Sequence, residues 1–115
     1  MRVWRLRPGG EFERVRQAGR SYSHRLLVLI AQSRTDAPGA PSRVAVVAGR
    51  RLGTAVIRHR AKRLLREAVH RHYARIPAGV DVIVMARAPL LQADLEQIAA
   101  ALAETLQHAQ LWRTD

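Results

Sequence analysis

The chain of 115 residues carries 20 Lys and Arg against 9 Asp and Glu, a formal net charge of +11. A charge of this size attracts polyanions, so RNA, DNA and an anionic membrane surface are the candidate partners. The absence of Cys excludes a disulfide framework and every thiolate metal site, zinc fingers included. No apolar run is longer than the one from Leu26 to Ala31, which is far too short to span a bilayer. We therefore expect one domain, residues 1–115, that lies in the cytoplasm without membrane attachment.

The first half of the chain predicts one helix and two strands. Apolar residues at helical spacing in 12–18 indicate a short helix, which would close on Gly19 in the left-handed conformation. Segment 22–32 changes from alternating to continuously apolar, which is typical of a strand buried at one end. Turn residues fill 33–42, and 43–49 predicts the next strand. We expect these two strands to pair antiparallel across the loop.

The second half predicts a long helix, a strand and a final helix. Thr54 is a fair N-cap for a helix that runs to about Ile76, where the Pro-Ala-Gly sequence 77–79 stops it. Segment 80–88 is the most strand-like of the chain, and leucines and an isoleucine at helical spacing in 91–106 mark an amphipathic helix. The order α-β-β-α-β-α predicts an α+β chain folded as a two-layer α/β sandwich.

The long helix combines an apolar stripe with a basic face. At 100° per residue, six positions fall within one stripe about 100° wide, the width typical of a helix that faces a core. They are Ile57, Ala61, Leu64, Leu65, Ala68 and His72. Glu67 is the one acid among six Lys and Arg in 53–72. A solvated arginine-rich helix without a ligand is the alternative, but like charges such as Arg58, Lys62 and Arg66 repel at i,i+4, which favours a bound polyanion.

The basic face predicts a set of phosphate-binding residues. Arg50 and Arg51 extend it, because they precede the helix N-terminus, which itself favours phosphate. The full set is Arg50, Arg51, Arg58, His59, Arg60, Lys62, Arg63 and Arg66. His59, His70 and His72 could instead form a catalytic cluster. We favour histidines near phosphate or at the core edge, since no carboxylate stands at a spacing that would orient them.

The segment GRRLGTAVIRHRAKRLLREAV, residues 49–69, resembles the signature segment of the protein subunit of bacterial ribonuclease P. That segment usually runs Lys-Lys-x-Gly-x-Ala-Val-x-Arg-Asn-Arg-x-x-Lys-Arg-Leu-x-Arg-Glu. The opening RLRPGGEFERVRQAGRSYSHRLLVL and the later PAGVDVIVMARAP are similar to the same family. The resemblance therefore covers almost the whole chain in order.

The resemblance implies the small subunit of a ribonucleoprotein that removes the 5′ leader of precursor tRNA by magnesium-dependent hydrolysis. The implied partners are ribonuclease P RNA and the 5′ leader of precursor tRNA. The catalytic centre would lie in the RNA, which would also bind most of the magnesium, so no residue of the protein is expected to be catalytic. The free protein would be monomeric. The family also implies a left-handed βαβ crossover, whereas about 98% of such crossovers are right-handed.

The resemblance further implies a cleft that holds the single-stranded leader. The candidate lining residues are Phe12, Arg16, Tyr22, Arg25 and Ile30. Arg16 and Ile30 stand where relatives often have aromatic residues, and His59 replaces the usual asparagine between two arginines. Gly-Arg-Arg at 49–51 replaces Ser-Lys-Lys and keeps the charge. Stacking of a base on a ring contributes roughly 1–3 kcal/mol, so we expect leader binding here to use guanidinium planes instead.

Other functions remain as alternatives. An architectural ribosomal protein would use the same basic patch, but it would need no groove for a single strand beside the helix. A helix-turn-helix DNA-binding module is weaker, because the segment before Gly53 predicts a strand where a partner helix is required. A membrane-surface helix is weaker still, because the apolar stripe lacks the Trp and Phe that such helices place at the interface.

Overall fold

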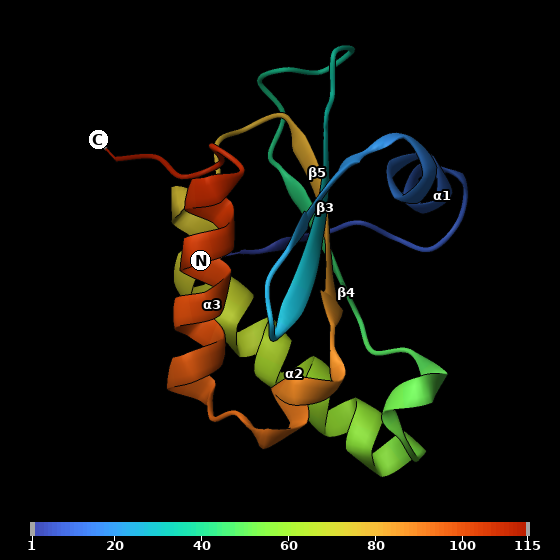
Figure 1. Cartoon of the computed structure of the whole chain (residues 1–115). Helices are drawn as coiled ribbons and strands as arrows, with labels where there is room; N and C mark the ends of the chain where they lie inside the picture. The colour runs from blue at the N-terminus through green and yellow to red at the C-terminus, as the bar shows by residue number, and fades with distance from the viewer. Residues whose placement is uncertain (1, 115) are drawn as a thin grey trace.

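The centre of the molecule is a five-stranded mixed sheet with the strand order β1-β4-β5-β3-β2 (Figure 1). The structure, a computed structural model, describes residues 2–114. The strands are β1 (Trp4–Arg5), β2 (Arg20–Ser23), β3 (Leu27–Ser33), β4 (Arg43–Val47) and β5 (Val80–Ala86). The helices are α1 (Gly10–Ala18), α2 (Ala55–His72) and α3 (Leu95–His108), with the 3-10 turns η1 (Arg50–Leu52), η2 (Tyr73–Arg75) and η3 (Ala88–Gln92).

Each face of the sheet carries its own apolar cluster, because side chains alternate along a strand. On β5, Val82 and Val84 belong to the cluster under α2 and α3, whereas Ile83 belongs to a smaller cluster with Val15 of α1. Figure 1 shows α2 and α3 on one side of the sheet and α1 on the other. The sheet is one of the two predicted layers of the α+β fold, and α2 and α3 form the other. The helix α1 covers part of the opposite face of the sheet.

The sequence predicted that the strands in 22–32 and 43–49, which overlap β3 and β4, pair with each other, and this prediction is wrong. β5 lies between them, antiparallel to β3 and parallel to β4. The physical reason is the apolar character of β5, whose residues 80–84 are all buried and therefore suit a central strand. β4 and β5 are parallel neighbours joined through α2, as a βαβ crossover requires. The left-handed sense of this crossover stays a prediction.

The expected first strand is two strands. β2 and β3 form an antiparallel hairpin whose turn is closed by a backbone hydrogen bond from His24 N to Leu27 O at 2.8 Å. The prediction of a left-handed Gly19 is also wrong, since its φ of −72° and ψ of 160° are extended. A Cβ at Gly19 would lie 2.6 Å from the Val15 carbonyl oxygen and 2.9 Å from Ile30 Cγ2. Close packing, rather than a positive φ, requires this glycine.

The helix caps follow the sequence closely. The backbone N–H of Ile57 donates to Oγ1 of Thr54 at 3.4 Å, which confirms Thr54 as the N-cap of α2. The helix ends at His72, and η2 continues towards the predicted stop. Asp94 and Gln97 form a capping box at the start of α3, with N–H to oxygen distances of 2.8 and 2.9 Å. No helix within residues 2–114 has the length and apolarity needed to cross a bilayer.

The apolar stripe of α2 is rotated and shortened relative to the prediction. Ala61, Leu65, Ala68 and Val69 are buried, although Val69 was not expected in the stripe. Ile57, which was expected there, is 39% exposed. Burial begins only at Ala61 because the first turn of α2 projects past the end of the sheet (Figure 1). The core face of α2 is therefore its middle and C-terminal part.

Candidate nucleic-acid interface

The eight predicted phosphate-binding residues lie on η1 and α2 at the surface. Arg58 and Lys62 are half-buried, and the other six are exposed. Within residues 2–114, none of the eight side chains forms an ion pair or a side-chain hydrogen bond. The Nε of Arg58 is even buried without a hydrogen-bond partner. The seven Arg and Lys side chains of this set therefore lie along η1 and α2 without an ion-pairing acid among the described residues.

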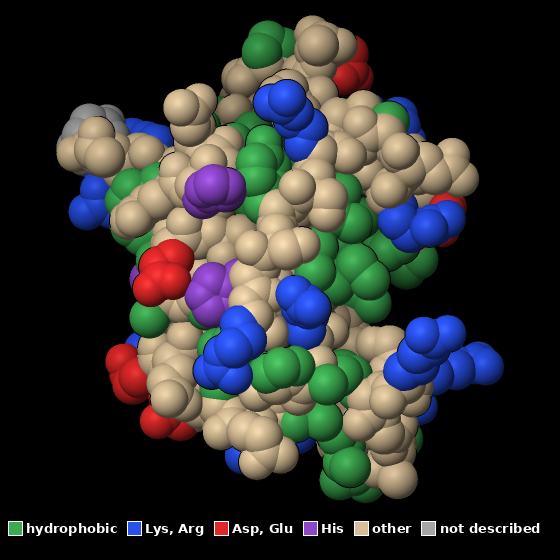
Figure 2. Space-filling view, in the orientation of Figure 1, with side chains coloured by type: hydrophobic (Ala, Val, Ile, Leu, Met, Phe, Trp, Pro, Cys, Tyr) green, Lys and Arg blue, Asp and Glu red, His purple; other side chains and the backbone are tan. Residues whose placement is uncertain are grey.

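Several acids of the described chain pair with arginines outside this set. Arg71, on the edge of α2 that faces α3, donates from Nη1 to Glu96 Oε2 at 2.8 Å. Arg14 and Arg43 pair with acids near α1. In Figure 2 several acidic side chains lie together at the left, apart from the Lys and Arg side chains at the lower centre and lower right, and other acidic side chains are visible at the top and right edge. Positive and negative charge are thus separated on the surface, which leaves the start of α2 free for an external anion.

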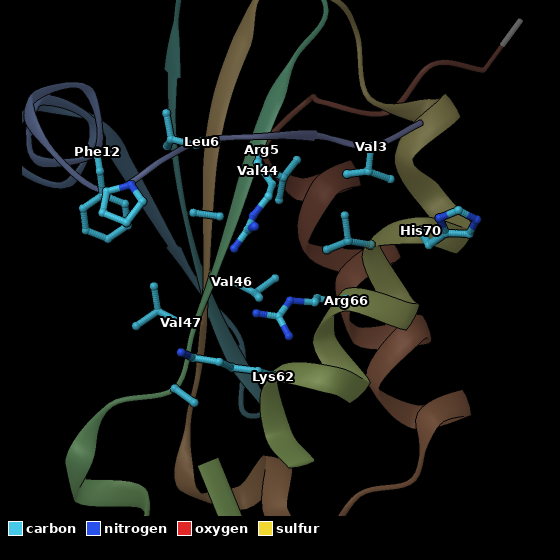
Figure 3. A pocket seen from close by; sticks show the side chains of 14 residues that line it. Val3, Arg5, Leu6, Phe12, Val44, Val46, Val47, Lys62, Arg66 and His70 are labelled. Carbon is cyan, nitrogen blue, oxygen red and sulfur yellow. The ribbon is translucent and has the colours of Figure 1, made fainter. Parts of the chain in front are cut away.

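A groove of about 750 Å³ runs along the outer edge of β4, between α1 and α2. Figure 3 shows Phe12 directed into it from α1, and Lys62 and Arg66 directed towards β4 from α2. Arg5 of β1 and His70 of α2 complete its polar lining. The floor is apolar and consists of residues 44–48. The α1 wall of the groove therefore presents the aromatic ring of Phe12, and the α2 wall presents the cationic groups of Lys62 and Arg66.

The outer edge of β4 is only partly covered. β1 pairs with Arg43 and Val44, and Leu6 N donates to Val44 O at 3.0 Å. From Ala45 onwards β4 has no strand partner on this side among the described residues. Val46 lies two residues after Val44, so its backbone N–H and C=O point to the same side, into the groove. The floor thus adds main-chain hydrogen-bonding groups to an apolar surface.

The predicted cleft residues divide into two groups. Phe12 lines the groove, and Ile30 lies under α1 in the same apolar cluster as Phe12, where it is 8% exposed. Arg16 is exposed on α1, but its guanidinium donates two hydrogen bonds to Oε2 of Glu13, at 3.1 and 2.8 Å. This hydrogen bonding raises the pKa of Arg16. Arg16 is therefore near the predicted cleft and already paired.

Tyr22 and Arg25 do not share a cleft with Phe12, so the prediction that one groove contains all five residues is wrong. Tyr22 on β2 is opposite Leu29, and both lie on the α2 and α3 side of the sheet. Its ring makes an edge contact with His108 of α3, with ring centroids 6.0 Å apart. Arg25 is exposed in the turn between β2 and β3. The cause is the separate β2 strand, which the sequence did not indicate.

The groove also contains residues that were predicted for another role or were missed. Lys62 and Arg66 were expected to bind RNA on the open face of α2, and the structure places them at the groove. His70 continues the same row. The i,i+4 spacing of these three residues is a signal in the sequence that could have shown their common side. Nothing comparable indicated Arg5, because β1 is only two residues long.

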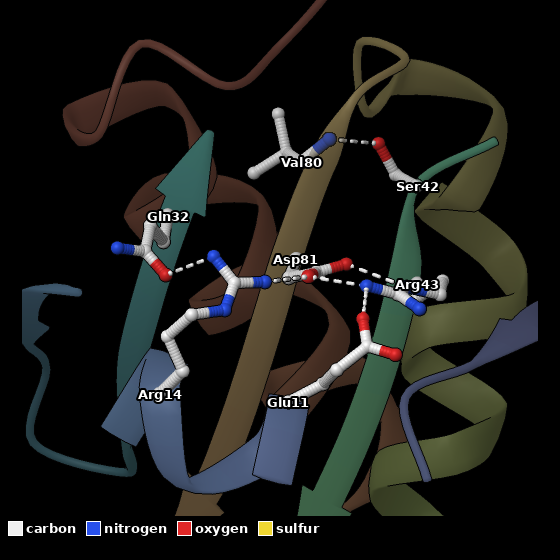
Figure 4. A network of polar contacts seen from close by, with 7 residues as sticks. All are labelled: Glu11, Arg14, Gln32, Ser42, Arg43, Val80 and Asp81. Atoms are coloured by element: carbon white, nitrogen blue, oxygen red, sulfur yellow. Dashed lines mark hydrogen bonds and ion pairs between the residues drawn. The ribbon is translucent and has the colours of Figure 1, made fainter. Parts of the chain in front are cut away.

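A buried carboxylate ties α1 to the sheet (Figure 4). Asp81 of β5 is fully buried and accepts hydrogen bonds from Arg43 of β4, Nε to Oδ1 at 2.8 Å and Nη2 to Oδ2 at 2.7 Å. Arg14 of α1 donates to Asp81 Oδ2 at 3.2 Å and to Gln32 Oε1 of β3 at 2.9 Å. Glu11 of α1 accepts a further hydrogen bond from Arg43. The helix that carries Phe12 is thus connected to three strands.

The pairing between Glu11 and Arg43 shifts the pKa of both groups. The hydrogen bond from Arg43, and then its charge, hold the pKa of Glu11 below its usual value. Hydrogen bonds to Asp81 and then to Glu11 raise the pKa of Arg43 above the usual value of an arginine. Because the pKa of Glu11 is lower in the folded state, its contribution to stability is present above the unfolded pKa and is lost as pH falls through the folded pKa. Acid therefore loosens the link between α1 and β4.

The histidines of α2 occupy different environments. His59 and His70 are exposed. His72 Nε2 is 2.9 Å from the Ala99 carbonyl oxygen, and its ring makes an edge contact with Trp112. The contacts of His72 are those of a core-edge residue. Within residues 2–114, no three His, Cys, Asp or Glu side chains come together as a metal site would require.

The fold and this surface define a class of protein: a small, basic α+β domain with unpaired cations along one helix and a groove beside it. The sequence model of the family described as ribonuclease P matches residues 1–110. A ribonuclease P protein component from Herpetosiphon aurantiacus is 46% identical over 113 residues, which cover 96% of this chain and 88% of that protein. The chain therefore belongs to the ribonuclease P protein family.

Solved structures of the same family share the fold. The ribonuclease P protein of Staphylococcus aureus superimposes with a TM-score of 0.83 at 28% identity, over 97% of this chain and 100% of that one. The protein from Thermotoga maritima gives a TM-score of 0.78 at 27% identity, over 90% of this chain and 96% of that one. These comparisons extend over nearly the full length of the chain.

Proposed function

We propose that this chain is the protein subunit of a ribonuclease P holoenzyme that matures the 5′ end of tRNA. The family membership supports the assignment to ribonuclease P. The observation that carries the finer proposal is the row of unpaired cations on η1 and α2 next to a groove with an aromatic wall. The cations would bind ribonuclease P RNA, and the groove would bind the 5′ leader of precursor tRNA.

The groove suits an extended single strand. Its two walls match the two parts of a nucleotide, because Phe12 can stack on a base while Lys62 and Arg66 contact phosphates. The exposed backbone of Val46 can bond to base edges or to ribose. An architectural ribosomal protein would need the basic surface but not this groove, so the groove favours a processing subunit over that alternative.

In this proposal the protein binds and positions its substrate, and the RNA performs the hydrolysis. The described residues offer no cluster of carboxylates for magnesium, so the RNA subunit would hold the metal ions. The protein would act as a monomer in the cytoplasm. Ribonuclease P RNA and precursor tRNA repel each other, and without the protein a high concentration of magnesium is needed to screen this repulsion. The positive charge of the protein would reduce it.

Reconstitution tests this division of labour. We expect the protein alone to leave precursor tRNA intact, and to lower the magnesium concentration at which a bacterial ribonuclease P RNA cleaves it. The measurement is the cleavage rate as a function of magnesium, with and without the protein. Cleavage by purified protein without RNA, or no effect of the protein on the magnesium requirement, would contradict the proposal.

Arg60→Ala and Arg63→Ala should weaken binding to ribonuclease P RNA while leaving the fold intact, because both side chains are exposed and unpaired. For every phosphate that the variant no longer neutralises, the plot of log affinity against log salt should flatten by about one unit. Binding titrations at several salt concentrations measure the slope. An unchanged slope with a lower melting temperature would show that these arginines serve the fold instead.

A further inference from the structure

Two large apolar side chains lie on the surface at the start of α2. Val56 is 79% exposed and Ile57 is 39% exposed, and Trp4 is the remaining exposed large apolar residue among those described. A single exposed apolar residue is common on protein surfaces. Here two β-branched residues are adjacent in one turn, at an end of the molecule where, within residues 2–114, α2 extends past the sheet beside η1 (Figure 1). We call Val56 and Ile57 the apolar tip.

The backbone holds the apolar tip in place. Gly53 has a φ of 145°, which L side chains rarely adopt, and a Cβ there would lie 3.0 Å from Cδ1 of Ile57. Ile57 therefore rests against the bare backbone of Gly53 on one side and stays open to solvent on the other. Thr54 caps the helix through the N–H of Ile57, which fixes this turn. The tip is a defined part of α2, because its turn is capped and packed.

The surroundings of the apolar tip are positive. η1 carries Arg50 and Arg51, α2 continues with Arg58, and neither element has an acid in its first turn. Figure 2 shows hydrophobic and basic side chains together at the end of the molecule where α2 begins. A second copy of this chain that docked through its own tip would bring the same positive charges to the contact and be repelled. The complementary partner has an apolar centre and a negative rim.

We propose that the apolar tip docks on unpaired bases or ribose faces of the ribonuclease P RNA. RNA presents such surfaces in loops and bulges, where unstacked bases are flanked by phosphates. The inference rests on the proposed function and adds a second component to it. The arginines bind phosphates and release counterions, whereas the apolar tip removes apolar surface from water, a term that salt does not screen.

The test is the affinity of Val56→Ser for ribonuclease P RNA, measured at several salt concentrations. Serine has a helix propensity close to that of valine, and Val56 is exposed, so the fold should survive. We expect affinity to fall about five- to thirtyfold, as the loss of part of a buried valine implies. The salt slope should stay that of the unchanged protein, in contrast to Arg60→Ala. Val56→Leu should keep most of the affinity.

Ala100→Ser is the matched control, since it makes a similar change on the exposed face of α3, away from η1 and α2. It should leave the affinity unchanged. Equal affinities of the Val56→Ser and unchanged proteins would overturn the inference and leave the proposed function standing. Failure of the unchanged protein to bind the RNA would overturn both. Loss of self-association or of vesicle binding, with RNA affinity intact, would assign the tip to another partner and also overturn the inference.

Discussion

Asp81→Ala is expected to lower the free energy of unfolding by about 3–5 kcal/mol, the usual cost of removing one partner from a buried ion pair. Asp81 is fully buried and accepts hydrogen bonds from both Arg43 and Arg14. Without it, the guanidinium of Arg43, whose side chain is only 19% exposed, keeps Glu11 as its one acidic partner among the described residues. Urea unfolding followed by circular dichroism measures the loss.

Two further variants separate the buried ion pair from general damage. Glu11→Gln removes an exposed carboxylate from the same arginine, so it should cost much less than Asp81→Ala. The double variant Asp81→Leu with Arg43→Met removes both buried charges and should recover much of the lost stability. A similar stability of Asp81→Ala and the unchanged protein would mean that the cluster with Val15 and Ile83 holds α1 without help.

Phe12→Ala should selectively weaken binding of precursor tRNA, because Phe12 provides the aromatic wall of the groove. Loss of one stacked base corresponds to about 1–3 kcal/mol, or roughly 5- to 150-fold in affinity. Mature tRNA lacks the leader, so its affinity should not change. The ratio of the two dissociation constants, measured with reconstituted holoenzyme, is the quantity to follow.

Phe12→Leu controls for packing, since leucine keeps an apolar contact with the cluster under α1 but cannot stack on a base. This variant should lose most of the preference for precursor over mature tRNA, while its free energy of unfolding stays close to that of the unchanged protein. Tyr22→Leu changes the aromatic residue on the opposite side of the sheet and should leave discrimination intact. Equal losses for Phe12→Leu and Tyr22→Leu, or equal losses for precursor and mature tRNA, would count against leader binding in this groove.

The sequence predicted features that depend on local pattern. Thr54 as the N-cap of α2 and the basic residues on its exposed side follow from spacing alone, and the structure confirms these positions. The pairing of β5 between β3 and β4 could not be predicted in this way, because each strand shows only which of its own faces is apolar. The hairpin prediction rested on adjacency in the chain, which here gives the wrong neighbour.

The candidate site was predictable to a similar degree. Lys62 and Arg66 were identified as binding residues, but their position at the groove depends on how α2 is rotated against the sheet. That rotation is set by Val69, which is buried, and Ile57, which is not. Tyr22 was misplaced because a turn after Ser23 reverses the chain and makes β2 an edge strand. Asp81 lies in a segment that is similar to the family, but nothing in the sequence showed that it joins Arg43 and Arg14.

The separation of charge has a consequence for how the protein meets RNA. Residues 1–75 hold 18 Lys and Arg against 4 acids, whereas residues 76–115 hold 2 against 5. The exposed acids Glu96 and Glu104 lie on α3, and the unpaired cations lie on η1 and α2. The molecule therefore has a permanent electric dipole, which the field of a polyanion rotates before contact. Encounters begin with the cationic end leading, so a larger share of collisions is productive at low salt.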